Sequence, residues 1–560
     1  MGCLAGKNVP PVKRLENLRR KAEIHRVVWF VLKVNGDFRH QRIHRGNLSK
    51  PPRPVNTKTS THQHGQCIGY LGIQLAIQNQ ALEFALELIR LFNGFDRFGC
   101  SFSSRHSFLC HRVHQVFLGV TRRSGHHTPV AGGKPRQIAI DTLLRSQQQQ
   151  VATERLLGDA LREATLTPAD TGLARELVSG CVRWRRLLDW LIERSTNGRE
   201  QKPAVREILR LGLYQIFFLT RIPDHAIANE SVRLAKRNKC LGQAGFINAM
   251  IRRFLREKES TFRVISGLQE DQPALGQSHP DWLFEVWEQR WGREKSIRLL
   301  EWNNQPAPTF ARVNRLKTDP ATLAKRWENE RVEVTAFDCD WAPTNTVFRL
   351  RNHPPIESIP SFQEGHFYIQ DPSTLLSVDL LAPEPGQAVL DLCAAPGGKT
   401  GLIAERMNNE GQLTATDISD ARLGLLRENC DRLGVTCATL GQAEDLLADD
   451  SPRFDRVLID VPCSNTGVMR RRLDLRWRIA PEETSFLIDT QRRLLERASR
   501  LTRPGGKIVY STCSIEPDEN ELLVKKFLDD NPGWQLEAER TLHPVDDHTD
   551  GAYAARLVKK

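Results

Sequence analysis

The chain of 560 residues is long enough for three or four domains and carries a formal net charge of +13, with 80 lysines and arginines against 67 aspartates and glutamates. That excess lies in residues 1–130, which hold 20 basic and 6 acidic side chains, so the overall charge does not by itself indicate a nucleic-acid-binding protein. The 12 cysteines include no CxxC pair, and the sequence shows neither a secretory signal nor an uncharged apolar run of about 18 residues, so we expect a soluble cytoplasmic protein without a disulfide scaffold, zinc site or membrane span.

Residues 1–130 differ from everything that follows. They contain 10 of the 16 histidines, scattered proline and serine, and no sustained hydrophobic period. A basic RNA-binding tail is one interpretation of this composition. We favour a disordered extension, or upstream sequence translated from a start codon chosen too early.

Residues 135–258 have the apolar spacing of successive amphipathic helices and predict an all-α bundle. The clearest helix start is Thr167 followed by Pro168, because threonine caps a helix N-terminus and proline fits the first turn. Several cations on these helices are candidates for phosphate contacts, although an ordinary solvated helix face explains each of them equally well. They are Arg183, Arg185, Arg186, Arg233, Lys236 and Arg237.

Residues 259–278 are polar and contain glycine and proline, which is typical of a linker. The segment 279–370 then combines helical patterns with a strand at 309–314, and predicts a small α+β domain. Arg312, Asn314 and Arg315 lie on or directly after that strand and could touch RNA, though an edge strand explains them too.

Residues 371–560 alternate apolar runs with helical patterns, as in a doubly wound α/β sheet of the Rossmann-like class. The apolar run 388–392 leads into Asp-Leu-Cys-Ala-Ala-Pro-Gly-Gly-Lys-Thr at 391–400, where a helical pattern begins. In such a sheet, this turn is where a ligand meets backbone amides and a helix N-terminus. The strands should close with an antiparallel pair formed by 534–537 and 552–558.

The turn matches neither common nucleotide fingerprint. A P-loop would require glycine at the position of Cys393, and GxGxxG is absent. The glycines at 397 and 398 would let the backbone approach a nucleoside-type cofactor, and Asp417, after the next apolar run, could accept hydrogen bonds from ribose hydroxyls. We therefore place S-adenosylmethionine first among the possible cofactors.

Two cysteines follow later strands of the same predicted sheet. The apolar run 454–460 ends in Asp460 and is followed by Cys463, while the run 506–510 is followed by Cys513. Both tails should lie at the carboxyl edge of the sheet. A thiolate that adds to carbon 6 of a pyrimidine makes carbon 5 able to accept a methyl group, and a second group nearby would assist the release step. The spacing alone does not decide which cysteine attacks.

The motifs at 391–399, 460–464 and 511–514 resemble those of the RNA cytosine-5 methyltransferases of the Nop/Sun family. The resemblance implies that Cys513 is the nucleophile, that Cys463 assists product release, and that Asp460 and Lys399 lie at the target base and the nucleophile. The residues it places around S-adenosylmethionine are Cys393, Ala394, Ala395, Pro396, Gly397, Gly398, Lys399, Asp417, Gln442 and Asp460.

One position departs from the family pattern. The family usually has Gly-Asp after the third strand, whereas this chain has Gly441 followed by Gln442. Either the amide of Gln442 or the carboxylate of Asp445 could make that contact with the cofactor.

Residues 135–258 are similar to the RNA-binding domain named after the antitermination factor NusB. This domain precedes the catalytic part in the family members that modify small-subunit ribosomal RNA. The resemblance therefore implies an enzyme acting on 16S ribosomal RNA, and we expect it to be a monomer. Two alternatives are the same chemistry on transfer RNA or DNA, and a non-catalytic RNA-binding ribosome assembly factor.

The segment 469–478 contains five arginines interleaved with Trp477 and directly follows the stretch after Asp460. We expect a flexible, basic loop that faces the substrate. Its arginines would neutralise phosphates while the tryptophan packs or stacks, because a base inside an RNA helix must be unstacked before a cysteine can reach it.

Overall fold

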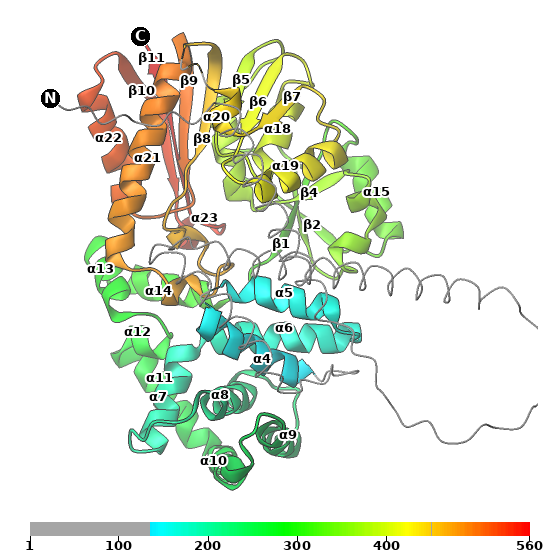
Figure 1. Cartoon of the computed structure of the whole chain (residues 1–560), viewed down its shortest axis with the longest axis vertical. Coiled ribbons are helices and arrows are strands. Elements are labelled where there is room, and N and C mark those ends of the chain that lie inside the picture. The colour runs from blue at the N-terminus through cyan, green and yellow to red at the C-terminus, as the bar shows by residue number, and fades with distance from the viewer. Residues whose placement is uncertain (1–134, 150, 448, 450) are drawn as a thin grey trace, which may run out of the picture. The chain divides into compact units, whose positions relative to one another are not determined.

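The computed structural model describes residues 135–149, 151–447, 449 and 451–560 (Figure 1). The expectation for residues 1–130 lies outside these residues. Three parts follow one another along the described chain: a helical bundle, a small α+β domain and a doubly wound α/β domain, in the predicted order. None of the described helices is long and apolar enough to cross a bilayer.

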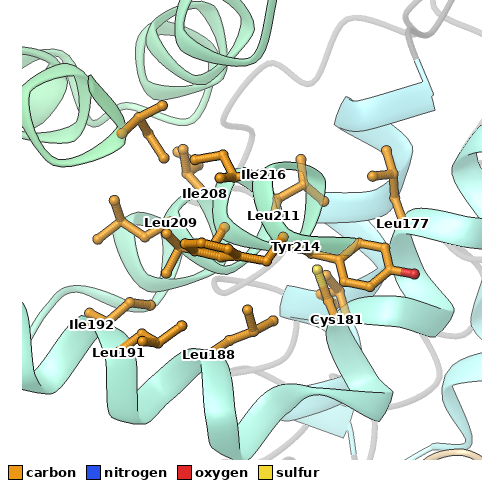
Figure 2. Close-up of a cluster of buried hydrophobic side chains, with 14 of the residues drawn as sticks. Leu177, Cys181, Leu188, Leu191, Ile192, Ile208, Leu209, Leu211, Tyr214 and Ile216 are labelled. Atoms are coloured by element: carbon orange, nitrogen blue, oxygen red, sulfur yellow. The ribbon is translucent and has the colours of Figure 1, made fainter. Parts of the chain in front are cut away.

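The first part is an all-α bundle organised around one helix, α8, which is buried along most of its length. In Figure 2, side chains of α8 pack against Leu177 and Cys181 of α6 and Leu188 of α7. The helix start predicted at Thr167 is present, since its side chain accepts a hydrogen bond from the Asp170 amide at 3.1 Å. The helices are α4 (Pro135–Gln149), α5 (Thr153–Glu163), α6 (Pro168–Arg183), α7 (Arg185–Ser195), α8 (Pro203–Phe218), α9 (Asp224–Arg237), η3 (Leu241–Gln243) and α10 (Ala244–Arg256).

Residues 259–278, expected to be a linker, are largely helical. They form most of α11 (Lys258–Asp271) and all of α12 (Pro273–Gly276). Phe262, Ile265 and Leu268 recur every three residues, and the latter two are buried in the core of the bundle. The polar composition suggested an irregular segment, but three apolar side chains on one face are enough to specify a helix that packs on the core.

The second part contains four α-helices, one 3-10 helix and a four-stranded antiparallel sheet with the order β2-β3-β1-β4. Its core surrounds Trp327, which is fully buried and has edge contacts with Phe348 and Phe367 at centroid distances of 5.4 and 5.3 Å. The elements are α13 (Asp281–Trp291), α14 (Arg293–Asn304), β1 (Thr309–Val313), α15 (Pro320–Asn329), β2 (Val334–Phe337), β3 (Val347–Leu350), η4 (Ile356–Ser358), α16 (Pro360–Gln363) and β4 (Phe367–Ile369).

The third part is a seven-stranded sheet with the order β10-β11-β9-β8-β5-β6-β7. Strands β9, β8, β5, β6 and β7 are parallel, and β11 and β10 add the predicted antiparallel pair. The elements are η5 (Pro372–Leu375), α17 (Leu376–Leu381), β5 (Ala388–Asp391), α18 (Gly398–Arg406), β6 (Gln412–Thr416), α19 (Asp420–Leu433), β7 (Ala438–Gly441), α20 (Ala443–Leu446), β8 (Phe454–Asp460), η6 (Thr466–Val468), η7 (Leu475–Trp477), α21 (Pro481–Leu501), β9 (Thr502–Thr512), η8 (Pro517–Glu519), α22 (Glu521–Asp530), β10 (Trp534–Leu542), α23 (Pro544–Asp547) and β11 (Ala552–Lys559).

Helices cover both faces of this sheet, so its central strands are apolar on both sides. On β8, Val457 and Ile459 pack toward α21 and α22, whereas Leu458 packs toward α17 and α18. The chain runs from β5 outward to β7 and then returns to β8, on the other side of β5. The strand order therefore reverses between β5 and β8, which places a ligand crevice at the carboxyl ends of these two strands.

Candidate active site

The turn at 391–400 joins β5 to α18, and two of its positions require glycine. Gly397 has φ +105°, in the left-handed region, and caps the helix. A Cβ on Gly398 would lie 2.6 Å from the ring of Tyr368, so this glycine makes room for a side chain of β4. Cys393 is half-buried in the same turn, and burial raises its pKa to about 12, which keeps the thiol protonated.

Asp391 closes β5 and is completely buried. Its Oδ2 accepts a hydrogen bond from Thr400 Oγ1 at 2.8 Å, while Oδ1 has no partner among the described residues. Burial raises the pKa of Asp391 to about 7, against the opposing hydrogen bond from Thr400.

The pKa of Asp391 predicts a pH-dependent difference in stability between the wild-type protein and Asp391→Asn. Because the folded-state pKa lies above the ordinary value of 3.8, the stability from this group is fully present below about pH 4 and is lost as the pH rises toward 7. The whole change corresponds to about 4 kcal/mol. Thermal unfolding should therefore show the Tm of Asp391→Asn rising relative to that of the wild type between pH 4 and pH 7. The exposed Asp445→Asn serves as control, and a Tm difference independent of pH would contradict the assignment.

Asp417 lies just beyond β6, at the same edge of the sheet, and is buried. Its carboxylate accepts hydrogen bonds from the amides of Ala395 and Ser419 at 3.3 and 3.4 Å. Arg422 of α19 pairs with it at 3.3 Å and also donates to the carbonyl of Ala395 at 2.7 Å. Asp417 is thereby tied to the 391–400 turn.

The position that departs from the family pattern also lies at this edge. Gln442 directly follows β7, and its amide donates to the carboxylate of Asp420 at 2.7 Å. Asp445 is exposed in the short helix α20. The bond to Asp420 uses one of the two N–H groups of the Gln442 side chain, so its second N–H and its Oε1 are left for a ligand.

Lys399 and Asp460 form an ion pair across the switch point between β5 and β8. Lys399 Nζ lies 2.6 Å from Asp460 Oδ2. Burial alone would lower the pKa of Lys399, but the charge and hydrogen bond of Asp460 raise it overall, and Cys513 acts in the same direction. The lysine is therefore an ammonium group close to both the carboxylate and that cysteine.

Cys463 and Cys513 lie side by side although 50 residues separate them, with their Sγ atoms 3.4 Å apart. Parallel pairing sets Asp460 of β8 opposite Ser511 of β9, so both cysteines leave the sheet at one edge. The Cys513 thiol donates to Asn465 Oδ1 at 3.2 Å, and the Asn465 amide donates to the carbonyl of Cys463 at 2.5 Å. The hydrogen bond with Cys513, together with burial, raises the pKa of Cys463 well above its ordinary value.

Comparison with known proteins decides which family has this arrangement. Family models match the NusB family at 133–256, the ferredoxin-like domain of RsmF/B-like methyltransferases at 279–348, and the 16S rRNA methyltransferase RsmB/F at 378–558. A probable ribosomal RNA small subunit methyltransferase B of Synechocystis is 35% identical over 76% of this chain and 99% of its own. Its counterpart in Bacillus subtilis is 33% identical over 71% of this chain and 89% of its own. The crystal structure of PH0851 shares the fold, with a TM-score of 0.63 at 22% identity over 76% of this chain and 99% of that one.

This chain belongs to the RsmB/F methyltransferase family. Membership confirms the resemblance drawn from the three motifs, and it makes the chain an enzyme that uses an S-adenosylmethionine-type methyl donor. The residues present fit such a donor, because Asp391 Oδ1 is a buried acceptor that no other described residue reaches and Asp417 is a second buried carboxylate at the next strand end. No cluster of three or more His, Cys, Asp or Glu side chains that could hold a metal occurs in the described part of the chain.

In this RsmB/F family member the arginine-rich segment 469–478 is not a flexible loop facing the substrate. Arg470 is buried, and its Nε donates to Asp550 at 2.8 Å. Arg471 donates to the carboxylate of Asp371 at 2.7 Å. These two arginines neutralise buried carboxylates within the protein, so they are not available to phosphates.

The second half of that segment contacts α14 of the small α+β domain and α6 of the helical bundle. Arg476 is fully buried and donates to Asn304 Oδ1 at 2.7 Å, and burial lowers its pKa to about 9. Trp477 donates through Nε1 to the carbonyl of Val182, at the end of α6, at 2.7 Å. The prediction failed because the burial of an arginine depends on carboxylates and carbonyls that are distant in sequence. The arginines of the segment that stay exposed are Arg472 and Arg478.

Two of the three residues considered for RNA contact near β1 are also internal. Arg312 is fully buried and forms an ion pair with Glu405 of α18 at 2.6 Å. Asn314 is buried and donates to the carbonyl of Leu433, at the end of α19, at 2.8 Å. Both fasten the small sheet to the methyltransferase domain. Arg315 is exposed.

The cations of the helical bundle that were considered for phosphate contacts also divide into internal and exposed side chains. Arg183 is buried, and Arg186 pairs with Asp281 of α13 at 2.6 Å. Arg185 is half-buried. The candidates with exposed side chains are Arg233, Lys236 and Arg237.

Sequence reasoning missed Asn465 and Arg422. Asn465 has φ +62° and links the two cysteine-bearing loops through its side chain. An asparagine two residues after Cys463, in a turn, was the available signal, since asparagine tolerates the left-handed region. Nothing in the helical pattern of α19 distinguished Arg422 from its solvated neighbours.

Proposed function

We propose that the chain transfers a methyl group from S-adenosylmethionine to carbon 5 of a cytosine in 16S ribosomal RNA, in the cytoplasm, through a covalent adduct with Cys513. The observation that carries this proposal is the pair of thiols 3.4 Å apart beside the ion pair of Lys399 and Asp460. Relatives named for methylation of small-subunit ribosomal RNA support the choice of substrate.

The first step is addition of the Cys513 thiolate to carbon 6 of the base. The new C–S bond leaves an electron pair at carbon 5, which would bond to the methyl carbon while the methyl–sulfonium bond of the donor breaks and leaves a neutral thioether. The ammonium of Lys399 would favour the thiolate electrostatically, and the carboxylate of Asp460 would accept hydrogen bonds from the polar edge of the base. S-adenosylmethionine, held by Asp417 and the 391–400 turn, supplies the methyl group.

The second step releases the product. The proton on carbon 5 leaves to solvent and its bonding pair re-forms the double bond between carbons 5 and 6, while the C–S bond breaks and its electron pair returns to the sulfur of Cys513. Cys463 suits this step because its raised pKa keeps its proton in place, 3.4 Å from the departing sulfur. Its S–H group would stabilise the thiolate that re-forms. The raised pKa of Cys463 disfavours its thiolate, which supports the family's assignment of Cys513 as the nucleophile.

Bisulfite sequencing of ribosomal and transfer RNA, from cells with and without the gene, tests this function. The expected result is one or more cytosines in 16S ribosomal RNA that are protected only when the protein is present. Loss of protection in transfer RNA instead would support the alternative substrate, and no change in either RNA would support a non-catalytic assembly factor.

A further inference from the structure

Glu519 is a fully buried carboxylate that lies behind the two cysteine-bearing loops. It ends the short helical turn η8, which follows the strand that delivers Cys513. The steps described above do not use it. We propose that Glu519 is a positioning residue that holds the two thiols at their working separation, and this inference rests on the proposed function.

The contacts of Glu519 reach the residue next to each thiol. Oε1 accepts from the main-chain amide of Ser464, the neighbour of Cys463, at 2.8 Å. Oε2 accepts from the hydroxyl of Ser514, the neighbour of Cys513, at 2.5 Å, and also from the hydroxyl of Ser464. One carboxylate therefore bridges the loops that follow β8 and β9.

The carboxylate is itself fixed by neighbouring elements. Gln491 of α21 donates to Glu519 Oε1 at 2.9 Å, and through the same amide to the carbonyl of Pro462 at 3.0 Å. The hydroxyl of Tyr510, on β9, donates to the main-chain carbonyl of Glu519 at 2.6 Å. Four donors thus meet the two oxygens of Glu519, which is the full compensation that a buried carboxylate requires.

The geometry explains why an acidic side chain is needed there. Alanine at 519 would leave the Ser464 amide and two serine hydroxyls buried without their acceptor, so both loops would relax. Glutamine at 519 keeps one acceptor oxygen for the Ser464 amide. Its NH₂ group can donate to the two serine hydroxyls if these rotate so that their oxygens accept. A shift of about 1 Å between reacting groups lowers a rate by about 10²-fold. We therefore expect a graded loss, larger for alanine than for glutamine.

The test compares Glu519→Ala, Glu519→Gln and a matched control in the full chain. Glu516 is buried three residues earlier and accepts from Trp287 Nε1 at 3.1 Å, away from the thiols, so Glu516→Gln reports general damage to this turn. At saturating RNA and S-adenosylmethionine, kcat should fall about 10²-fold in Glu519→Ala and about 10-fold in Glu519→Gln, with KM for RNA and donor affinity within about threefold. Glu516→Gln should keep kcat within about threefold, whatever its Tm.

Each outcome bears on one hypothesis. A folded Glu519→Ala protein with wild-type kcat would overturn the positioning role, as would an equal loss of kcat in Glu516→Gln and Glu519→Gln. If Glu519→Ala fails to fold, Glu519→Gln decides alone: a loss of kcat without a loss of RNA or donor affinity supports the role, and an unchanged kcat overturns it. If the wild-type protein methylates no RNA, the proposed function itself is wrong.

Discussion

Replacing Cys513 with alanine is expected to lower the methylation rate at least about 10³-fold, while the affinity for S-adenosylmethionine stays within about threefold of the wild-type value. The sulfur of Cys513 is the atom that must bond to carbon 6, and no neighbouring thiol can replace it: Cys463 holds its proton because of its raised pKa, and so does Cys393. The acceptors expected at the donor, Asp391 and Asp417, are untouched. Transfer of labelled methyl groups to 16S ribosomal RNA measures the rate, and titration calorimetry measures donor binding.

A matched control is available at the opposite edge of the sheet. Cys437 is half-buried immediately before β7, at the amino end of that strand, so its thiol is remote from the crevice. Cys437→Ala should methylate RNA at close to the wild-type rate. Wild-type activity in Cys513→Ala would show that the nucleophile is assigned wrongly.

Replacing Cys463 with alanine should instead stall the reaction after methyl transfer, before the product is released. Addition of Cys513 and methyl transfer can still occur, but the departing sulfur loses the S–H group that lies 3.4 Å away. We expect turnover to fall about 10²-fold and a covalent complex of protein and RNA to accumulate. A band of retarded mobility that survives denaturing electrophoresis, and disappears after ribonuclease digestion, would reveal it.

The double variant Cys463→Ala, Cys513→Ala separates this explanation from non-specific cross-linking. It should form no adduct, because the bond to RNA is made by Cys513. An adduct that persisted in the double variant, or a Cys463→Ala protein that turned over normally, would remove Cys463 from the release step.

The turn at 391–400 could be predicted from the sequence because the residues that form it are neighbours along the chain. The order of apolar run, small-residue turn and helix start at 391–400 is encoded within about ten neighbouring residues, and the backbone there needs glycine for reasons of φ and close packing. The parallel strands were predictable for a similar reason, since continuous apolar runs such as that of β8 arise when both faces of a sheet are covered. The sheet rule then implied that residues following β8 and β9 would meet at one edge.

Only the tertiary structure decided which charged groups are internal. Arg312, Arg470 and Arg476 each looked available to RNA, yet each is buried against carboxylates or carbonyls more than 70 residues away in the chain. Glu519, which the sequence did not single out, is fully buried between the two cysteine loops.

The sequence by itself therefore determined the class of fold and the family, and it nominated the residues that we propose carry the chemistry, because these depend on periodicity and on short contiguous motifs. Only the folded chain decided the 3.4 Å separation of the thiols, the pairing of Lys399 with Asp460, and which arginines are buried and which are exposed. The physical reason is that burial of a charge is stable only where distant residues supply its partners, and the set of partners exists only once the chain has folded.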